Sequence, residues 1–168
     1  GDLGNAEIFA NSGMSVFNLF ESTVRTKSGK KQDLEEVLFQ QQYHTIYLML
    51  GINELGYDYS SIIRKYQSVV DTIKTRQPNA VIVLGANLHV TAQKSSSSST
   101  YTNEKINQIN SGIRAIAENS DCCYIDVNSI FDDENGALKT SYSTDGSHVL
   151  GKYYSVWTDW LKGESPDA

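Results

Sequence analysis

The sequence predicts an α/β protein in which helices cover both faces of a parallel sheet, a three-layer α/β/α sandwich. Short apolar segments typical of buried strands alternate along the chain with longer segments whose apolar residues recur at helical intervals. This alternation implies right-handed crossovers between parallel strands. Ligands of such sheets bind beyond the carboxyl ends of the strands, so we look for functional residues directly after each predicted strand.

Length and composition indicate one folded domain. The 168 residues are enough for a single core, and we assign residues 1–162 to the domain and residues 163–168 to a C-terminal tail. Hydrophobic residues make up 39% of the chain and charged residues 20%, which excludes a disordered acidic tail. No apolar run approaches the ~20 residues that a membrane-spanning helix needs.

The charge of the chain argues against a nucleic-acid partner. The formal net charge is -6, whereas binding to a phosphate backbone requires clustered Lys and Arg. The densest basic stretch, residues 27–31, is expected to be a solvated loop rather than a binding patch.

Three short apolar segments are expected to form buried parallel strands, and they cover residues 46–50, 80–84 and 123–127. A weaker candidate strand covers residues 6–10. The adjacent Cys122 and Cys123 have a spacing that suits neither a zinc site nor an ordinary disulfide. We therefore interpret both cysteines as small strand residues.

Two long helices are predicted from apolar residues at intervals of three and four. The clearest covers residues 58–76, and Pro78 ends it. The second covers residues 102–119 and has a stripe of isoleucines along one side. Each stripe is wide enough to pack against the sheet.

Shorter or later helices are predicted at two other places. An early helix begins at Asp33, where Glu36 completes a capping box, and a last amphipathic helix covers residues 149–161. The serine run at residues 95–99 lies between a strand and a helix and is expected to be a mobile surface loop.

Two predicted strand ends have groups that suit an oxyanion. Gly51 permits a tight turn after the strand 46–50, and this turn can present the Asn53 amide as a hydrogen-bond donor. After the first candidate strand, the backbone N–H of Gly13 can point at the same anion. The alternatives stay open at this point, because Asn53 can instead cap a helix and Gly13 can be an ordinary turn glycine.

An acid and a base lie close together near the C-terminus. Asp145 precedes His148 by three residues, so its carboxylate can hold the imidazole Nδ1 and leave Nε2 free as a general base. His44 and His89 have no acidic residue at suitable spacing. We interpret both as structural or surface residues, although His89 follows a strand and could line the pocket.

These residues, in this order, resemble the SGNH/GDSL hydrolase family, whose four sequence blocks contribute Ser, Gly, Asn and His. Gly13 in Ser12-Gly13-Met14-Ser15 matches the second block, Asn53 in Gly51-Ile52-Asn53-Glu54 the third, and Asp145 with His148 the last. The resemblance implies a flavodoxin-like parallel sheet. The tail is similar to the bacterial branch of the family through residues 145–150, Tyr153 and Trp157.

The chain departs from the family pattern at two blocks. Glu54 stands where the third block usually has Asp, and the Gly-Asp-Ser of the first block is not present. Gly1-Asp2-Leu3 is no substitute, because Leu3 has no nucleophilic atom and lies too near Gly13. The resemblance implies that the missing strand lies beside the strand 46–50. We therefore expect the native protein to continue upstream of Gly1, so that this chain lacks the first strand of the fold.

The resemblance implies hydrolysis of an acyl ester on a small molecule or a glycan, without a metal or organic cofactor. The absent serine attacks the ester, His148 is the base, Asp145 orients His148, and Gly13 and Asn53 hold the oxyanion. The chain as printed is therefore expected to be inactive.

Two other interpretations stay open. In one, Ser12 or Ser15 is the nucleophile, although neither lies in a Gly-x-Ser-x-Gly pattern. In the other, the protein is a non-catalytic module that binds carbohydrate at a cell surface. The sequence leaves the substrate and the oligomeric state open, and it slightly favours an extracellular or surface-attached bacterial protein.

Overall fold

The structure is a computed structural model in which residues 17, 19–21, 23–25, 29–40, 42–48 and 55–142 are described. Within these residues the chain forms a three-stranded sheet, a two-stranded sheet, five α-helices and one short 3-10 helix. The strand expected at residues 6–10 and the helix expected at residues 149–161 lie outside the described residues. No helix in the described part is long and apolar enough to cross a membrane.

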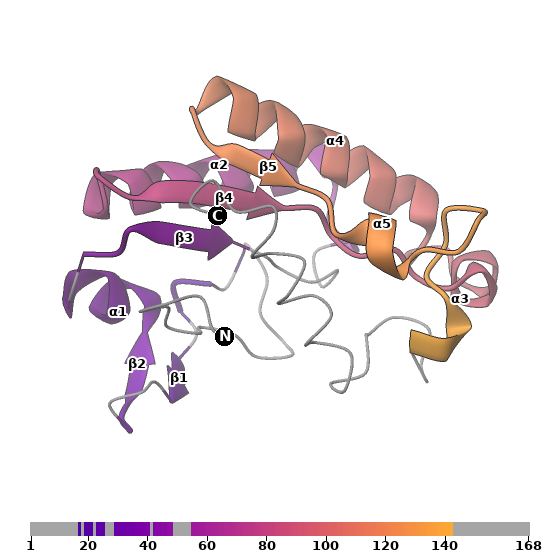
Figure 1. Ribbon diagram of the computed structural model, residues 1–168, viewed down its shortest axis with the longest axis horizontal. Coiled ribbons are helices and arrows are strands. Elements are labelled where there is room, and N and C mark those ends of the chain that lie inside the picture. Colours follow the sequence, from indigo (N-terminus) through magenta and orange to yellow (C-terminus); the bar gives the residue numbers. More distant parts are fainter. Residues whose placement is uncertain are drawn as a thin grey trace.

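The central sheet consists of β3 (Thr45–Leu48), β4 (Val81–Gly85) and β5 (Cys123–Ile125), all parallel, in the order β3-β4-β5. The three predicted strands are thus confirmed. The last strand ends at Ile125 rather than at the predicted Val127, because the Asp126 carboxylate accepts a hydrogen bond from Asn128 N–H and the chain turns there into a helix. All three carboxyl ends lie on one side of the molecule (Figure 1).

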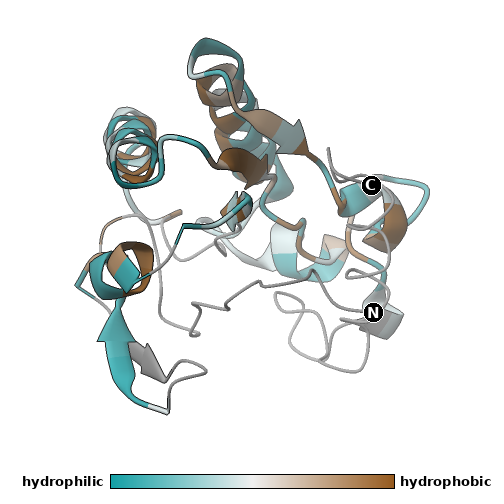
Figure 2. Cartoon of the chain, turned by 60° about the vertical axis from the view of Figure 1, so that its left-hand side comes forward, coloured by the Kyte–Doolittle hydropathy of each residue, from teal (hydrophilic) through white to brown (hydrophobic). Residues whose placement is uncertain are grey.

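Helices α2 (Tyr59–Arg76) and α4 (Asn103–Asn119) confirm the two predicted long helices. Asp58 and Thr102 cap them, each accepting a hydrogen bond from the backbone N–H three residues on. Both helices contribute to the main core with β3 and β4. Figure 2 shows hydrophilic and hydrophobic residues on different sides of the long helices. Their buried residues include Ile62, Tyr66, Val69, Val70 and Ile73 on α2, and Ile106, Ile109, Ile113 and Ile116 on α4.

The two long helices pack closely where Gly112 of α4 meets α2. A Cβ atom at this position would lie 2.4 Å from Ile63 Cδ1 and 2.7 Å from the Tyr59 hydroxyl. The absence of a side chain at Gly112 therefore allows the close approach of the two helices. This packing fixes α4 against the sheet and so fixes the residues that α4 presents near the strand ends.

The N-terminal part of the described chain differs in one respect from the prediction. Helix α1 (Leu34–Gln40) has the predicted capping box, since Glu36 N–H donates to Asp33 Oδ1 at 2.8 Å. However, β1 (Thr23–Arg25) and β2 (Lys31–Asp33) form an antiparallel hairpin that was not predicted. Gly29 and Lys30, within the stretch expected to be a solvated loop, are exposed and lie between the two strands. The hairpin escaped prediction because its strands have no alternating apolar residues that would reveal a buried face.

Part of the serine run is helical where the sequence suggested a loop. Residues 92–97 form helix α3 (Ala92–Ser97), which Thr91 caps. After it, the Ser98 hydroxyl accepts hydrogen bonds from the N–H groups of Thr100 and Tyr101. Serine hydroxyls of the low-complexity stretch therefore bind the local backbone.

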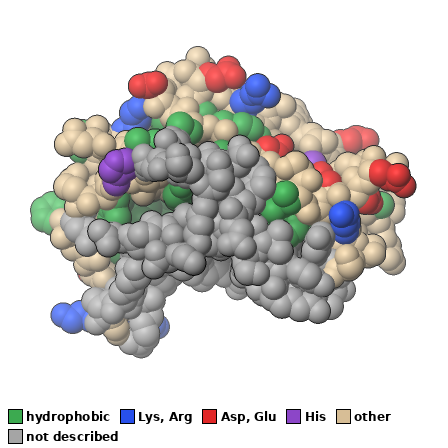
Figure 3. All heavy atoms as spheres, in the orientation of Figure 1, with side chains coloured by type: hydrophobic (Ala, Val, Ile, Leu, Met, Phe, Trp, Pro, Cys, Tyr) green, Lys and Arg blue, Asp and Glu red, His purple; other side chains and the backbone are tan. Residues whose placement is uncertain are grey.

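Beyond the carboxyl end of β5, the chain forms α5 (Asn128–Phe131) and the 3-10 helix η1 (Thr140–Tyr142), which the sequence did not predict. Phe131 is fully buried in a small cluster with Val127 and Leu138. Figure 1 shows both helices on the side to which the strands point. In Figure 3 the acidic and basic side chains of the described part are interspersed rather than gathered by sign.

Candidate functional site

The residues that the sequence singles out for catalysis lie outside the described residues. This holds for the expected base and its acid, for both oxyanion donors, for the alternative nucleophiles, and for the residue that departs from the third block. Of the predicted site residues, the structure places only His89. The predicted site residues outside the described part are Ser12, Gly13, Ser15, Asn53, Glu54, Asp145 and His148.

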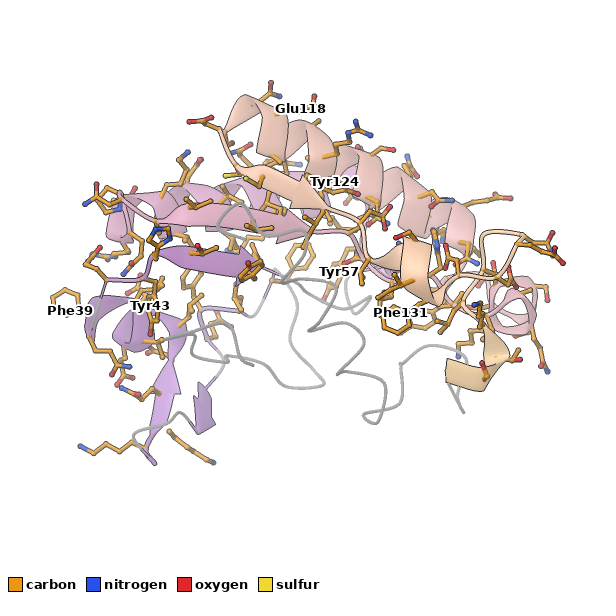
Figure 4. The ribbon with its side chains drawn as sticks, viewed as in Figure 1. Phe39, Tyr43, Tyr57, Glu118, Tyr124 and Phe131 are labelled. Carbon is orange, nitrogen blue, oxygen red and sulfur yellow. The ribbon has the colours of Figure 1, made fainter. Side chains whose placement is uncertain are left out.

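The described residues that flank both oxyanion candidates come together. Phe17 follows Gly13 by four residues and Tyr57 follows Asn53 by four, and the ring centroids of Phe17 and Tyr57 are 4.2 Å apart. Next to these rings along the chain, Leu19 and Leu55 are buried in the main core. The two segments thus have neighbouring anchors, and Figure 4 shows Tyr57 beyond the carboxyl end of β3.

The segment that leads to Asp145 and His148 leaves the described part on the side to which the strands point (Figure 1). It follows η1, whose last residue, Tyr142, precedes Asp145 by three positions. A chain extends by at most ~3.6 Å per residue, so six residues after Tyr142 can span about 20 Å. The described residue that precedes Asp145 most closely in sequence is therefore on the side of the sheet where ligands of parallel sheets bind (Figure 1).

His89 is a buried residue with two side-chain partners, which fits the structural role that the sequence suggested. Its side chain is 10% exposed, and Nδ1 lies 2.7 Å from Asp132 Oδ2. Its Nε2 lies 2.6 Å from Asn107 Oδ1. Sequence spacing did not reveal this acidic partner, because Asp132 is 43 residues away in sequence and only the fold brings it close.

The environment of His89 favours the doubly protonated ring. Burial lowers the pKa of His89, but hydrogen bonds to Asp132 and Asn107 and the negative charges of Asp132 and Asp126 outweigh burial and raise it above 6.5. Both ring nitrogens face acceptor oxygens, so the imidazolium satisfies both contacts as a donor. A ring held in this way has no free nitrogen to act as a general base.

Asparagine side chains hold the backbone of residues 86–91, which we call the β4–α3 loop. Asn87 N–H donates to Asn110 Oδ1 at 2.7 Å, and Asn110 Nδ2 donates back to Asn87 O at 3.0 Å. Asn128 Nδ2 donates to the same carbonyl, and Asn128 Oδ1 accepts from His89 N–H at 2.9 Å. The loop is therefore fastened to both α4 and α5.

A third asparagine completes this arrangement. Asn103 Oδ1 accepts from Val90 N–H at 2.8 Å, and Asn103 Nδ2 donates to Val90 O at 3.0 Å. Sequence reasoning missed these residues, although a signal existed: Asn103, Asn107 and Asn110 recur at intervals of four and three along α4. Asn87 itself is fully buried, and neither atom of its side-chain amide has a hydrogen-bond partner among the described residues.

The described residues provide no metal site. No group of three or more His, Cys, Asp or Glu side chains in the described part of the chain could hold a metal ion. Cys122 and Cys123 are free thiols of intermediate exposure, and burial raises the pKa of Cys122. Cys123 begins β5 as expected, whereas Cys122 precedes the strand.

Comparison with known proteins bears on the whole chain. The sequence model of the GDSL-like lipase/acylhydrolase family matches residues 7–154, a span that includes Gly13, Asn53, Asp145 and His148. No curated protein matches the sequence.

Several solved structures share the fold. A protein from Streptococcus pneumoniae, described provisionally as a platelet activating factor, has a TM-score of 0.73 at 22% identity, covering 90% of this chain and 68% of that one. A GDSL-like lipase from Bacteroides thetaiotaomicron has a TM-score of 0.65 at 17% identity, covering 91% and 71%. An acetyl xylan esterase has a TM-score of 0.66 at 16% identity, covering 91% and 77%.

Proposed function

We propose, because the chain belongs to the GDSL-like lipase/acylhydrolase family, that it hydrolyses acyl esters by a Ser-His-Asp mechanism. The nucleophilic serine belongs to a Gly-Asp-Ser segment that residues 1–168 do not contain. We therefore assign to these residues every other catalytic group of the reaction, and we assign the serine to the complete gene product.

The proposed roles follow from the chemistry of each group. His148 takes the proton of the serine hydroxyl as the serine attacks the acyl carbon, and it then protonates the leaving alcohol. Asp145 orients the imidazole and stabilises its charged form. Gly13 N–H and the Asn53 amide stabilise the oxyanion of the tetrahedral intermediate. A water molecule then attacks the acyl-enzyme, with His148 again as base, and releases the acid.

One observation carries the proposal: the flanks of the two oxyanion segments meet in the structure. The contact between Phe17 and Tyr57 brings together residues that lie only four positions from Gly13 and Asn53. The two donors must lie within hydrogen-bond distance of one oxygen, so neighbouring flanks are a condition that the proposal has to meet.

His89 supports the assignment of His148 by contrast. Both ring nitrogens of His89 are occupied, by Asp132 and by Asn107, whereas a general base needs one free nitrogen. Of the remaining histidines, exposed His44 precedes β3, at the opposite end of the strand from the proposed site. His148 is therefore the histidine that we assign to catalysis.

We propose an ester of a small molecule or a glycan as the substrate class. Solved proteins with this fold include an acetyl xylan esterase and a peptidoglycan O-acetylesterase. Both descriptions name acyl groups on polysaccharides, which makes acetylated glycans the first substrates to test.

The proposal is tested by hydrolysis of p-nitrophenyl acetate with the complete gene product. We expect turnover that His148→Ala abolishes and that Asn53→Ala lowers by about 10²–10³ in kcat, as for the loss of one oxyanion donor. His44→Ala is the matched control, because it removes an exposed histidine that precedes β3, at the opposite end of the strand from the proposed site. Equal turnover in His148→Ala and the unchanged protein would refute the mechanism.

Residues 1–168 alone provide the second arm of the test. We expect negligible hydrolysis from them, because they lack the proposed nucleophile. Robust turnover that disappears in His148→Ala would assign the nucleophile to Ser12 or Ser15, which fluorophosphonate labelling and peptide mapping would distinguish. Binding of acetylated glycan without turnover by the complete gene product would favour the non-catalytic module.

A further inference from the structure

We infer that His89 and Asp132 form a buried clamp that positions the β4–α3 loop at the edge of the catalytic site. The clamp is a positioning device, since neither residue is assigned a contact with substrate. The inference rests on the proposed function only in placing the site at the carboxyl ends of the strands. The contacts of the clamp stand independently of any activity.

The loop needs positioning because its backbone is held by side chains rather than by regular structure. The N–H groups of Asn87, His89 and Val90 donate to asparagine oxygens of Asn110, Asn128 and Asn103, respectively. Each of these asparagines belongs to α4 or α5. The path of the loop therefore depends on where the amino-terminal half of α4 and the short helix α5 lie relative to each other.

His89 is the loop side chain that joins these two elements. Its Nδ1 contacts Asp132, which directly follows α5, and its Nε2 contacts Asn107 in the second turn of α4. One rigid ring thus sets the spacing between two helices whose asparagines hold the loop backbone. A flexible side chain of similar size could not impose that spacing as well.

The His89–Asp132 pair is charged and largely buried, so each partner depends on the other. The side chains of His89 and Asp132 are 10% and 15% exposed. A buried ion pair adds little net stability, but the loss of one partner is costly because the other charge stays behind. Asp132 Oδ1 is buried without a hydrogen-bond partner among the described residues, so His89 is its main compensation there.

The charged groups around His89 all have the same sign. From α4 the neutral amide of Asn107 contacts the ring, while Asp132 faces it directly and Asp126 acts from the end of β5. A cation at His89 is thus favoured from each side. The neutral ring would leave one contact without its donor.

The loop that the clamp positions lies at the carboxyl end of β4, on the side of the sheet where we propose the site. It begins where β4 ends, and β4 lies beside β3, whose carboxyl end leads to Asn53. Within the loop, Leu88 packs on the cluster formed by Val127, Phe131 and Leu138. A shift of α5 relative to α4 would therefore move the loop at the carboxyl end of β4.

Amide hydrogen exchange of the full chain tests the clamp without any need for turnover. We expect His89→Gln to lower the protection of the Asn87 and Val90 amides by about tenfold or more, since hydrogen bonds to charged groups are worth at least that factor. The amides of Val83 and Leu84 in β4 are the internal control and should keep their protection. Unchanged protection at Asn87 and Val90 would overturn the inference, as would an equal loss in β4.

A second measurement covers the case in which His89→Gln fails to fold. In the unchanged chain, raising the pH removes the charge of His89, so the protection factors of Asn87 and Val90 should fall while those of β4 stay constant. Protection factors that stay constant at all four positions would refute the clamp.

The conservative variant Asp132→Asn separates positioning from mere packing. It keeps the shape and one acceptor oxygen, so we expect a smaller loss of loop protection than in His89→Gln. In the active gene product, Asp132→Asn should change KM and kcat together while His148→Ala removes kcat. Absent ester hydrolysis would overturn the proposed function alone, whereas intact loop protection in His89→Gln would overturn the clamp alone.

Discussion

Two regions of this molecule are held together by opposite means. Where α2 and α4 cover the sheet, isoleucine, valine and tyrosine side chains are buried against one another, and Gly112 lets the helices approach. At the carboxyl end of β4, the β4–α3 loop is held by asparagine amides and the His89–Asp132 pair. The first region is stabilised by burial of apolar surface and by close packing, and the second by hydrogen bonds between defined partners.

The comparison indicates that the helical layer mainly stabilises this fold, whereas the polar loop orients groups near the strand ends. Apolar burial is non-directional and is the dominant favourable contribution to folding, so the helical layer mainly supplies stability. The polar loop fixes directions at the edge where the strands end. Figure 4 places Phe131 and Tyr57 at this edge, while Phe39 points outward at the opposite end of the molecule.

The largest effect is expected in the helical layer. Ile113 is fully buried in the main core, so Ile113→Ala should lower the free energy of unfolding by about 2–5 kcal/mol through lost burial and a cavity. Urea denaturation measures this change. Glu118→Ala on the same helix is the control, since the Glu118 side chain is 68% exposed and its loss should cost within about 0.5 kcal/mol. Equal costs for both variants would contradict this picture of the layer.

A smaller effect is expected at the loop. Asn128→Ala removes the acceptor of His89 N–H at 2.9 Å and one donor to Asn87 O, leaving buried backbone groups unsatisfied. We expect a loss of about 1–3 kcal/mol in urea denaturation. Exposed Asn135 serves as the matched control for removal of an asparagine amide. If the two asparagine variants unfold at the same urea concentration, the amide contacts do not hold the loop.

The smallest expected effect is a difference between the two regions in how their contribution to stability depends on pH. Burial lowers the pKa of His89 in the folded protein, but Asp132, Asn107 and Asp126 outweigh burial and raise the pKa above 6.5. The stability that His89 contributes is therefore fully present below about pH 6.5 and is lost as the pH rises through the pKa of the folded state. We expect the stability difference between the unchanged protein and His89→Gln to shrink over that window. The cost of Ile113→Ala, which removes no titratable group, should stay constant, and a parallel change in both would contradict the assignment.

The helical layer could be predicted from the sequence because its signals are local. Apolar residues recur along α2 and α4 at intervals of three and four, and Asp58, Thr102 and Asp33 mark helix starts by their own side chains. The hairpin β1–β2 and helix α3 escaped prediction, since a polar hairpin and a serine-rich helix lack such periodicity.

The candidate site could be predicted only in part. The order of Gly13, Asn53 and the Asp145–His148 pair indicated the chemistry, and the family match spans them. The clamp could not be predicted, because Asp132 is 43 residues from His89 and nothing local to either residue signals the contact. Interactions across such separations depend on the fold and not on sequence spacing.

The most direct test of the account is a crystal structure of the complete gene product after reaction with a fluorophosphonate, whose phosphonyl group has the shape of the tetrahedral intermediate. We predict a phosphonyl oxygen within about 2.7–3.1 Å of both Gly13 N and Asn53 Nδ2, with His148 Nε2 facing the modified serine. A structure with these three groups on separate faces, or with His89 rather than His148 beside the phosphonyl group, would contradict the account.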